Sequence, residues 1–377
     1  MKILLFTLEY PPFKGGIANY YGNLVRHCPK DNEIFVLHNN ENKLLSNKIY
    51  PKWIPAFFTL YKSIKKNKIN HVIVGHILPL GTVTFLLSKI FNFKYSIVLH
   101  GMDLEYALKR KQKKYLAKLI LKHAQTIIST NSYVEKKMLN FLGSKFDHKS
   151  FVVNPGVSSR NVESFGSVPS KTASKQDGRG TWNAGEFSNF RKKHDLEGKF
   201  ILFTVGRLVR RKGQDRVIEA VQNLREIIPN LYYYIAGAGE DEMYLKNLAK
   251  NNSHVKFLGA IDDAEKDLWL KNCDIFIMPS RDINGDVEGF GIVYLEAALA
   301  GKPVIAGRSG GVSDAVVDYE TGILVEPDNV DSIEDAIQEL YRNFDLRQEL
   351  GDNAMKRAIS SFSWKGQAGK FFEICGN

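Results

Sequence analysis

The sequence is poor in cysteine and has no long apolar run. Its cysteines lie far apart, show no spacing typical of a metal site and are odd in number (Cys28, Cys273 and Cys375). This usage fits a reducing cytosol better than a disulfide framework. No apolar run reaches the roughly 18–20 residues that span a bilayer. The apolar start of the chain is too short for a signal peptide and is interrupted by Glu9, so it predicts a buried strand instead.

Several motifs with well-defined chemistry are also missing. The chain contains neither G-x-G-x-x-G nor G-x-x-x-x-G-K-[ST], so neither complete phosphate-binding pattern is present. No two aspartates are spaced as D-x-D, and the nine histidines form no obvious ligand pair, which disfavours metal chemistry. No Ser-His-Asp or Cys-His arrangement for nucleophilic catalysis stands out.

Acidic residues are scarce in the first part of the chain. Residues 1–150 hold 24 Lys and Arg against 8 Asp and Glu, a net charge of +16, whereas residues 151–377 hold 28 against 33, a net charge of −5. This asymmetry favours a first half that faces a polyanion, either nucleic acid or an anionic membrane. The alternative is a lysine-rich surface that is only solvated.

Short apolar runs alternate with helix-length segments, which predicts an α/β fold with doubly wound parallel sheets. The first set of expected strands lies at 2–8, 34–37, 71–74, 95–99, 126–129 and 151–153, and the second at 200–205, 231–236, 255–258, 274–278, 303–306 and 322–325. The segment between the two sets is rich in Ser, Gly, Asn and Lys and has no apolar periodicity. We therefore predict an N-terminal domain at 1–157, a linker or mobile insertion at 158–194 and a C-terminal domain at 195–359.

A glycine-rich turn, Glu288-Gly289-Phe290-Gly291, precedes a short predicted helix at 292–300. Free backbone amides that run into a helix N-terminus form an anion site. Glu288 lies before the helix, where its carboxylate could contact a polar ligand. Glu296 lies about one turn into the helix, where it could accept hydrogen bonds from two hydroxyls, as from a ribose. The alternative is that Glu296 only complements the helix dipole and that Glu288 is a solvated loop charge.

Other candidate ligand-binding residues follow predicted strands. Arg207 and Lys212 come after the first strand of the second domain, and this pair of cations suits a diphosphate. Gly15-Gly16 separates a strand from a helix, as in phosphate-binding βα units, and His100 directly follows another strand. Because open α/β sheets bind ligands at the carboxyl ends of their strands, we expect two half-sites facing a cleft. A basic surface loop and a structural histidine are the simpler alternatives.

Three further segments carry partner predictions. Lys62, Lys65, Lys66 and Lys68 form one basic cluster near Tyr61 and Ile64. Seven basic residues crowd another predicted helix (Lys109, Arg110, Lys111, Lys113, Lys114, Lys118 and Lys122). Tyr115, Leu116 and Leu119 interleave with them, as in helices that lie on a membrane surface, although a solvated face would look the same. The segment 360–377 contains several aromatic residues, and we predict a helix there that packs back on the N-terminal domain.

Taken together, these motifs resemble the retaining glycosyltransferases of family 4. The resemblance runs nearly end to end, because the order and spacing of the pieces agree as well as their identity. It is carried by Glu9-Tyr10-Pro11-Pro12, Gly15-Gly16-Ile17, Leu99-His100-Gly101, Asn154-Pro155-Gly156, Gly206-Arg207, Lys212-Gly213, Glu288-Gly289-Phe290-Gly291, Glu296, Gly301-Lys302-Pro303 and Gly310-Gly311. The stretch from Ser280 to Glu296 is similar to bacterial mannosyltransferases that act on phosphatidylinositol mannosides. The long segment 158–194 departs from the family pattern.

The resemblance implies the GT-B architecture, in which two Rossmann-like domains face a cleft. It also implies roles for residues of the second domain. Arg207 and Lys212 would hold the diphosphate of the sugar donor, and Glu296 would hold the ribose hydroxyls. Glu288 would contact the transferred sugar, and the backbone amides of Phe290, Gly291 and Ile292 would contact sugar or phosphate.

In the first domain, the resemblance places the Gly15-Gly16 loop against the donor phosphates. It places His100 against the sugar near the anomeric carbon. In the front-face mechanism proposed for such families, the departing phosphate takes the proton of the acceptor. No dedicated base is then required. The predicted catalytic residues are His100, Glu288, Arg207 and Lys212, with no metal.

The sequence therefore predicts a metal-independent, retaining hexosyltransferase with no cofactor apart from its nucleoside-diphosphate sugar co-substrate. GDP-mannose is the first choice of donor, and a lipid-linked or envelope glycan is the expected acceptor. We expect a cytoplasmic protein docked on the inner face of the membrane and no nucleic-acid partner. A sugar-nucleotide epimerase of the same architecture and a basic nucleic-acid-binding protein are the alternatives.

Overall fold

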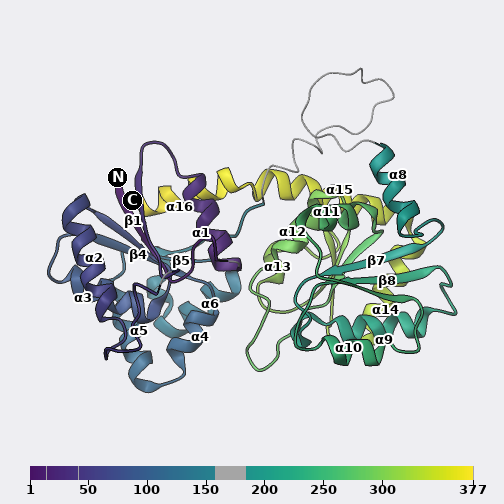
Figure 1. Cartoon of the computed structure of the whole chain (residues 1–377), viewed down its shortest axis with the longest axis horizontal. Coiled ribbons are helices and arrows are strands. Elements are labelled where there is room, and N and C mark those ends of the chain that lie inside the picture. The colour runs from purple at the N-terminus through teal and green to yellow at the C-terminus, as the bar shows by residue number, and fades with distance from the viewer. Residues whose placement is uncertain (14, 41, 158–183, 377) are drawn as a thin grey trace, which may run out of the picture. The chain divides into compact units, whose positions relative to one another are not determined.

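The computed structural model describes residues 1–13, 15–40, 42–157 and 184–376 of the 377-residue chain. The chain divides into two compact units. Unit 1 comprises Met1–Gly156 and Trp364–Asn377, and unit 2 comprises Val157–Ser363. Each unit contains a parallel sheet with helices on both faces (Figure 1).

Unit 1 is built on a six-stranded parallel sheet in the order β2-β1-β3-β4-β5-β6. Its strands are β1 (Lys2–Phe6), β2 (Glu33–Leu37), β3 (His71–Val74), β4 (Lys94–Leu99), β5 (Thr126–Ser129) and β6 (Ser150–Val152). Parallel strands that are buried on both faces have continuous apolar sequences rather than alternating apolar and polar residues. The run Ile3–Phe6 is such a case, with all four side chains buried.

The helices of unit 1 form two separate cores with the sheet. One face is covered by α2 (Ile54–Asn67), α3 (Thr82–Ser88), α4 (Met102–Leu108), α5 (Lys111–His123) and α6 (Ser132–Leu142). The other face is covered by α1 (Gly16–Arg26) and α16 (Trp364–Gly376). The helix at the end of the chain therefore completes the core of the first unit, where Trp364 contacts Tyr20 with ring centroids 5.8 Å apart.

Unit 2 is also built on a six-stranded parallel sheet, in the order β12-β11-β10-β7-β8-β9. Its strands are β7 (Phe200–Val205), β8 (Leu231–Ala236), β9 (Val255–Gly259), β10 (Ile275–Met278), β11 (Val304–Gly307) and β12 (Gly322–Val325). One face packs against α8 (Ala184–Lys193), α11 (Asp263–Asn272), α12 (Ile292–Leu299), α13 (Val312–Ala315) and α15 (Phe344–Ser361). The other face packs against α9 (Gln214–Leu224), α10 (Glu242–Leu248) and α14 (Val330–Arg342).

The chain crosses between the units twice, after Gly156 and after Ser363. Within unit 2 the two crossing segments are hydrogen bonded, because Val157 N–H donates to the Phe362 carbonyl over 2.7 Å. Within unit 1 a Cβ on Gly156 would lie 2.9 Å from the Trp364 Cα. Only glycine allows the two backbones to pass so closely there.

The predicted fold class is confirmed, since both sheets are parallel and flanked by helices on both faces. The prediction of one helix through the aromatic segment after residue 360 is wrong, because α15 ends at Ser361 and α16 begins at Trp364. The predicted linker 158–194 includes α8, whose Phe190 is buried in the core of unit 2. Its remaining residues 158–183 lie outside the described part of the chain.

Candidate functional site

The candidate site of unit 2 lies where the strand order reverses. Strands β7 and β10 are neighbours, with β8 and β9 on one side of the pair and β11 and β12 on the other. Open α/β sheets bind ligands outside the carboxyl ends of the strands at such a switch point. The loop after β7 carries Arg207 and Lys212, and the loop after β10 carries Glu288. The topology therefore brings both predicted loops to one place.

Glu288 joins the two loops through a buried cluster of charges. Its Oε2 atom lies 2.5 Å from Lys212 Nζ and 2.7 Å from Arg211 Nη1. Arg211 also reaches Asp286, with its Nε 3.2 Å from Oδ1. Arg211, Lys212 and Glu288 are each less than 10% exposed. The suggestion that Glu288 is a solvated loop charge is therefore wrong.

The charge state of this cluster follows from its burial and its partners. Burial raises the pKa of Glu288, but the adjacent Lys212 and Arg211 cations outweigh burial and lower that pKa below its usual range. Burial lowers the pKa of Lys212, and Glu288 partly offsets that effect. The Glu288 carboxylate is thus held ionised between two cations.

Two glycines allow the loops to approach each other. Gly213 has a φ of 76°, and a Cβ there would lie 2.2 Å from the Pro279 carbonyl oxygen at the end of β10. Gly291 has a φ of 78°, and a Cβ there would lie 2.4 Å from the ring of Tyr294. Tyr294 is buried and donates a hydrogen bond to the Met278 carbonyl over 2.8 Å. A larger residue at Gly213 would separate the two loops, and one at Gly291 would displace the Tyr294 ring.

The turn before α12 leaves a row of backbone donors without partners. Within the described residues, no hydrogen-bond acceptor is found for the N–H groups of residues 289–293. Gly311 N–H donates to the Glu288 carbonyl over 2.9 Å and fixes the start of this turn. These N–H groups lie at the N-terminus of α12, which is eight residues long, and next to the cluster of Lys212, Arg211 and Glu288. This arrangement suits a phosphate or a sugar hydroxyl.

Arg207 and Glu296 flank this cluster but differ from it in exposure. Arg207 is exposed, and its guanidinium has no ion-pair partner in the described part of the chain. It is therefore available to a ligand. Glu296 is half-buried on α12, and its Oε1 lies 2.8 Å from Lys266 Nζ. Phe290 is buried against Phe362, so only its backbone is available to a ligand.

A second buried ion pair braces the two loops. Arg281 Nη2 lies 2.8 Å from Asp215 Oδ2, and both residues are less than 5% exposed. Asp215 lies at the start of α9, directly after the Lys212 loop, and Arg281 follows β10. Arg281 N–H also donates to the Arg211 carbonyl over 2.8 Å. The pair therefore fixes the backbone that carries Arg211 and Lys212 against the loop that leads to Glu288.

The candidate half-site of unit 1 also lies at a reversal of strand order, between β1 and β3. Gly15 and Gly16 are exposed between β1 and α1, and a Cβ on Gly16 would have no neighbour within 4 Å. His100 follows β4, and its Nε2 lies 2.8 Å from the Tyr21 hydroxyl. His100 N–H donates to Asp103 Oδ1 over 3.0 Å. The half-site thus combines an open glycine loop with a firmly held imidazole.

Burial keeps the histidines of this half-site uncharged. Burial and the neighbouring His76 lower the pKa of His100 to about 3. Burial also lowers the pKa of His76 to about 4, and the Nδ1 atom of this residue has no partner in the described structure. Burial raises the pKa of Asp103 to about 6, although hydrogen bonds from the backbone of His100 and its neighbours act in the opposite direction. At neutral pH His100 is therefore a neutral imidazole.

The structure brings together most of the predicted residues within each unit. It also shows contacting residues around the candidate sites that the sequence alone did not identify. Arg211 contacts Glu288 directly, and its only signal in the sequence was its place in the run Arg210-Arg211-Lys212. Asp286 and Tyr21 are partners of Arg211 and His100, and no sequence motif marked Tyr21.

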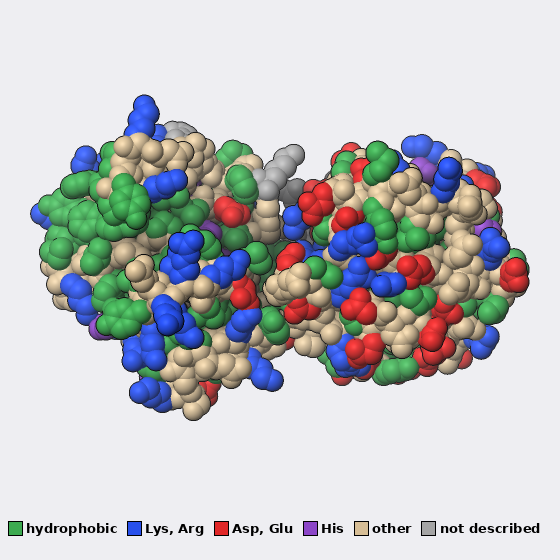
Figure 2. All heavy atoms as spheres, turned by 90° about the horizontal axis from the view of Figure 1, so that it is seen from below, with side chains coloured by type: hydrophobic (Ala, Val, Ile, Leu, Met, Phe, Trp, Pro, Cys, Tyr) green, Lys and Arg blue, Asp and Glu red, His purple; other side chains and the backbone are tan. Residues whose placement is uncertain are grey.

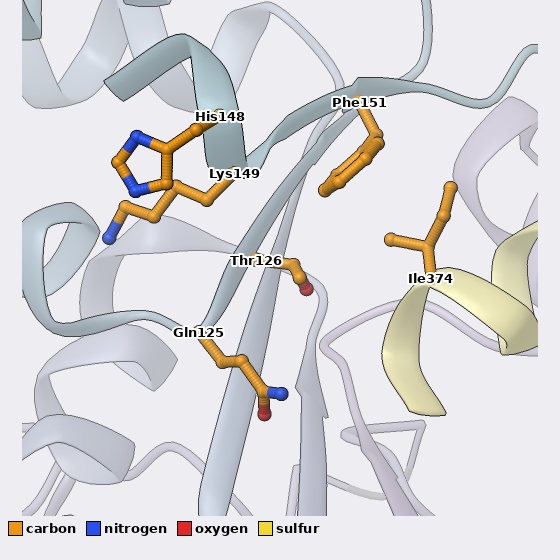
Figure 3. A pocket seen from close by; sticks show the side chains of 6 residues that line it. All are labelled: Gln125, Thr126, His148, Lys149, Phe151 and Ile374. Atoms are coloured by element: carbon orange, nitrogen blue, oxygen red, sulfur yellow. The ribbon is translucent and has the colours of Figure 1, made fainter. Parts of the chain in front are cut away.

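A metal-binding cluster or a cavity could also form a ligand site. No cluster of three or more metal-ligating side chains is found among the described residues. A cavity of about 290 Å³ opens in unit 1, and Figure 3 shows His148 and Lys149 on one side of it and Phe151 and Ile374 on the other. Gln125 and Thr126 lie where β5 begins, so this cavity is at the amino edge of the sheet, away from Gly16 and His100. Lys149 Nζ is engaged there with three backbone carbonyls at the end of α5.

Comparison with known proteins agrees with the motifs. Residues 186–357 match the family described as "Glycosyl transferases group 1". A GDP-mannose-dependent monoacylated alpha-(1-6)-phosphatidylinositol monomannoside mannosyltransferase of Corynebacterium glutamicum is 28% identical, over 97% of this chain and 95% of the relative. An uncharacterized glycosyltransferase of Methanocaldococcus jannaschii is 27% identical, over 97% and 95% of the two chains.

Solved structures agree with the fold. A glycosyltransferase of Rickettsia africae has a TM-score of 0.79 at 18% identity, over 99% of this chain and 97% of that one. Anabaena HepE in complex with UDP has a TM-score of 0.78 at 18% identity, with both chains fully covered. The predicted GT-B organisation of two Rossmann-like units is thereby confirmed, as is the resemblance to family 4 glycosyltransferases.

Proposed function

We propose that this chain, a group 1 glycosyltransferase by sequence and fold, is a retaining and metal-independent mannosyltransferase. Its donor is GDP-mannose, and its acceptor is a lipid-linked or envelope glycan. The relatives whose names specify a GDP-mannose-dependent mannosyltransferase acting on a phosphatidylinositol monomannoside support this choice over a UDP-linked hexose. The site of action is the inner face of the cell membrane. The same relatives, which act on a lipid-linked mannoside, support this location.

The observation that carries the proposal is the cluster at the switch point of unit 2. A sugar nucleotide presents a diphosphate with two negative charges next to a sugar rich in hydroxyls. Arg207 is exposed beside Lys212 and Arg211, and the N–H groups of residues 289–293 have no acceptor among the residues that the structure describes. Together they provide cationic and neutral donors for the diphosphate, while the Glu288 carboxylate accepts hydrogen bonds from sugar hydroxyls. Glu296 is placed on α12 to accept from the ribose.

In the proposed reaction an acceptor hydroxyl attacks the anomeric carbon on the face from which the diphosphate leaves. The bond between the anomeric carbon and the phosphate oxygen breaks as the new glycosidic bond forms. The hydroxyl proton passes to the departing phosphate oxygen. Arg207, Lys212 and the amides before α12 stabilise the negative charge that develops on that phosphate. These groups take the place that a divalent cation holds in other sugar transferases, so no metal is required.

His100 serves this reaction as a neutral group. Its Nε2 is hydrogen bonded to Tyr21, and its pKa is far below neutral, so it brings no positive charge to a developing oxocarbenium ion. We propose that it packs against the sugar and orients a hydroxyl through its ring edge. The open position of Gly16 lets the loop before α1 approach the phosphates without a side chain in the way.

A thermal-shift screen of sugar nucleotides tests the donor assignment. A ligand that binds only the native state raises the melting temperature. GDP-mannose should give the largest shift, and UDP-glucose and UDP-galactose should give smaller ones. Transfer of labelled mannose to a membrane lipid extract should then proceed in the presence of EDTA and yield an α-linked product. Loss of transfer with EDTA that magnesium or manganese restores would contradict metal independence.

The same assay separates the alternative functions. An epimerase would convert the sugar nucleotide without any acceptor, so product that forms in the absence of lipid extract would favour it. Binding to RNA or DNA that persists at physiological salt, with no shift from any sugar nucleotide, would favour the nucleic-acid-binding alternative.

A further inference from the structure

The side of unit 1 formed by α2, α3 and the segment before α2 exposes large apolar side chains. The residues concerned are Ile49, Tyr50, Phe58, Leu86 and Ile90, which are 39–90% exposed. We call this set the α2–α3 face. Figure 2 shows a broad group of apolar side chains on unit 1, with Lys and Arg side chains around it. Exposed apolar patches of this kind mark surfaces that bind a protein or a membrane.

Contacts join the α2 part of this face to the segment that follows α3. Tyr61 of α2 packs against Phe91, which directly follows Ile90, with ring centroids 5.5 Å apart. Phe58 lies one turn before Tyr61 on α2, so its side chain emerges on the same side. Lys65 lies one turn after Tyr61, with its Nζ 4.9 Å from the Tyr61 ring and 5.8 Å from the Phe91 ring. The apolar side chains therefore adjoin a rim of lysine.

The segment of chain that forms this face carries charge of one sign only. Residues 42–102 contain no Asp or Glu, whereas they contain nine lysines (Lys43, Lys48, Lys52, Lys62, Lys65, Lys66, Lys68, Lys89 and Lys94). All nine are exposed. A second copy of this face would meet it with like charge, which disfavours a symmetric dimer. A negatively charged partner fits instead.

The types of apolar residue on this face indicate which kind of negatively charged partner binds it. Ile49, Leu86 and Ile90 are aliphatic, and aliphatic side chains do not provide the stacking platform that single-stranded nucleic acids use. Aliphatic and aromatic side chains ringed by lysines match the boundary between headgroups and acyl chains of an anionic bilayer. We infer that the α2–α3 face is the surface through which this protein docks on an anionic membrane. The inference rests on the proposed function, since a lipid-linked acceptor is reached at a membrane.

This surface includes the smaller basic cluster that the sequence predicted, at Lys62–Lys68, but not the larger one on α5. In α5, Ala117, Ile120 and Leu121 are buried in the core of unit 1, and Leu116 and Leu119 are half-buried. Tyr115 is the large apolar residue that α5 exposes, at 68%. The lysines of α5 therefore add electrostatic attraction near the membrane, while the α2–α3 face supplies the side chains that insert.

Vesicle co-sedimentation of the full chain tests the inference. The vesicles are phosphatidylcholine with phosphatidylglycerol, and phosphatidylcholine alone as the neutral control. The wild type should sediment with the anionic vesicles and not with the neutral ones. The variant Tyr50→Ser/Phe58→Ser/Ile90→Ser should bind more weakly by at least about tenfold, and Tyr115→Ser on α5 should stay within about twofold of the wild type. Exchanging Lys62, Lys65 and Lys66 for Gln should weaken binding by about fivefold per lysine at low salt.

Two outcomes would overturn the inference. One is a wild type that ignores anionic vesicles at low salt. The other is a triple apolar variant that binds like the wild type while Tyr115→Ser loses binding. Self-association that the apolar variant abolishes, without vesicle binding, would make this face an interface between copies. Melting temperatures with and without GDP-mannose show which of the two proposals fails. If GDP-mannose raises the melting temperature but the protein does not bind vesicles, only the docking surface is wrong. If the protein binds vesicles but no sugar nucleotide raises the melting temperature, only the proposed function is wrong.

Discussion

Lys212 and Glu288 form a buried ion pair, with Nζ 2.5 Å from Oε2, and Arg211 shares the same carboxylate oxygen. Glu288 thus pairs with two cations that have almost no access to water, and the more exposed Asp286 pairs with Arg211 as well. Removing one partner of a buried pair leaves an uncompensated charge, which costs about 3–5 kcal/mol. The loop that would hold the donor phosphates is therefore organised before any ligand binds, and Glu288 has a structural role in addition to its proposed contact with sugar.

Exchanging Glu288 for Gln should separate these two roles. Glu288→Gln keeps the shape of the side chain but removes the charge between Arg211 and Lys212. We expect kcat to fall more than donor affinity, because electrostatic effects act mostly on charge that develops in the transition state. The melting temperature should fall as well. Glu296→Gln is the control and should raise the KM for the donor with little effect on kcat. Equal kcat values for Glu288→Gln and the wild type would contradict the assignment.

Arg207→Ala should weaken donor binding without a loss of stability. Arg207 is exposed and has no ion-pair partner in the described residues, so the folded unit does not depend on it. A charge-assisted contact is worth roughly 1.5–3 kcal/mol, or about 10- to 100-fold in affinity. Calorimetric titration with GDP-mannose measures the change. Arg225→Ala removes an equal, exposed charge at the far end of α9 and should leave affinity unchanged.

Gly16→Ala should lower activity while the protein becomes slightly more stable. No atom of the described residues lies within 4 Å of the added Cβ, and alanine in the first turn of α1 reduces the freedom of the unfolded chain, worth about 0.4–1 kcal/mol. A fall in transfer rate would then come from the methyl group meeting the donor phosphates. Gly198→Ala is the control. Gly198 also has open space around it but has a positive φ, so the alanine should reduce stability and leave the KM for the donor unchanged. Full activity of Gly16→Ala would remove this loop from the site.

The Asp215–Arg281 pair should matter more for stability than any exposed pair. Both side chains are less than 5% exposed, so Asp215→Asn removes the buried carboxylate of Arg281 and leaves it only the more distant and exposed Asp328. We expect a loss of about 3–5 kcal/mol in the free energy of unfolding, measured by urea denaturation. Arg308→Gln breaks exposed pairs with Asp318 and Glu326 and should cost less than about 1 kcal/mol. A small loss for Asp215→Asn would mean that the loops are braced by other contacts.

Stability should decrease in acid because of buried histidines in unit 1. Burial lowers the pKa of His71 to about 4, with Lys94 adding to the effect, and the pKa values of His76 and His100 are lowered to about 4 and about 3. Below about pH 6.5 the unfolded chain takes up protons at these side chains that the folded unit does not, so unfolding becomes favourable as the pH falls. Asp103 acts in the opposite direction, since its raised pKa gives stability at low pH that is lost as the pH rises through about 6.

With three histidines against one aspartate, the melting temperature should fall between about pH 6.5 and about pH 4. Thermal melts across this range measure the slope. His71→Gln keeps a hydrogen-bonding group next to Ser96 and should reduce the slope, whereas His148→Gln on the exposed surface should not. A slope that His71→Gln leaves unchanged would mean that other groups govern the acid sensitivity.

Local pattern was sufficient for the sheets but not for the contacts between distant segments. Strands such as β3, β5, β7, β8 and β12 match their predicted bounds, because buried parallel strands are short apolar runs between turn residues. The break between α15 and α16 depends on Phe362, whose carbonyl accepts the N–H of Val157. No sequence window near residue 362 contains that information.

The same limit applies to the site. In Arg210-Arg211-Lys212 the sequence does not show which arginine is buried. Arg211 is buried because a carboxylate 77 residues later in the chain, Glu288, reaches it through the reversal of strand order. Arg210 instead stacks over Tyr244, with its guanidinium carbon 3.5 Å from the ring centre. Motif spacing therefore located the loop, and only the fold assigned the individual side chains.

The position of α16 has a consequence for biosynthesis. Tyr20, Tyr21 and Leu24 of α1 are covered by a core that includes Trp364, Phe371 and Phe372. A ribosome synthesises these aromatic residues only after the whole of unit 2. Until then, one face of the sheet in the nascent first unit is incompletely covered. Chaperones or other chains can bind that exposed face. Unit 2, continuous in sequence, can finish folding first, so the order of maturation is opposite to the order of synthesis.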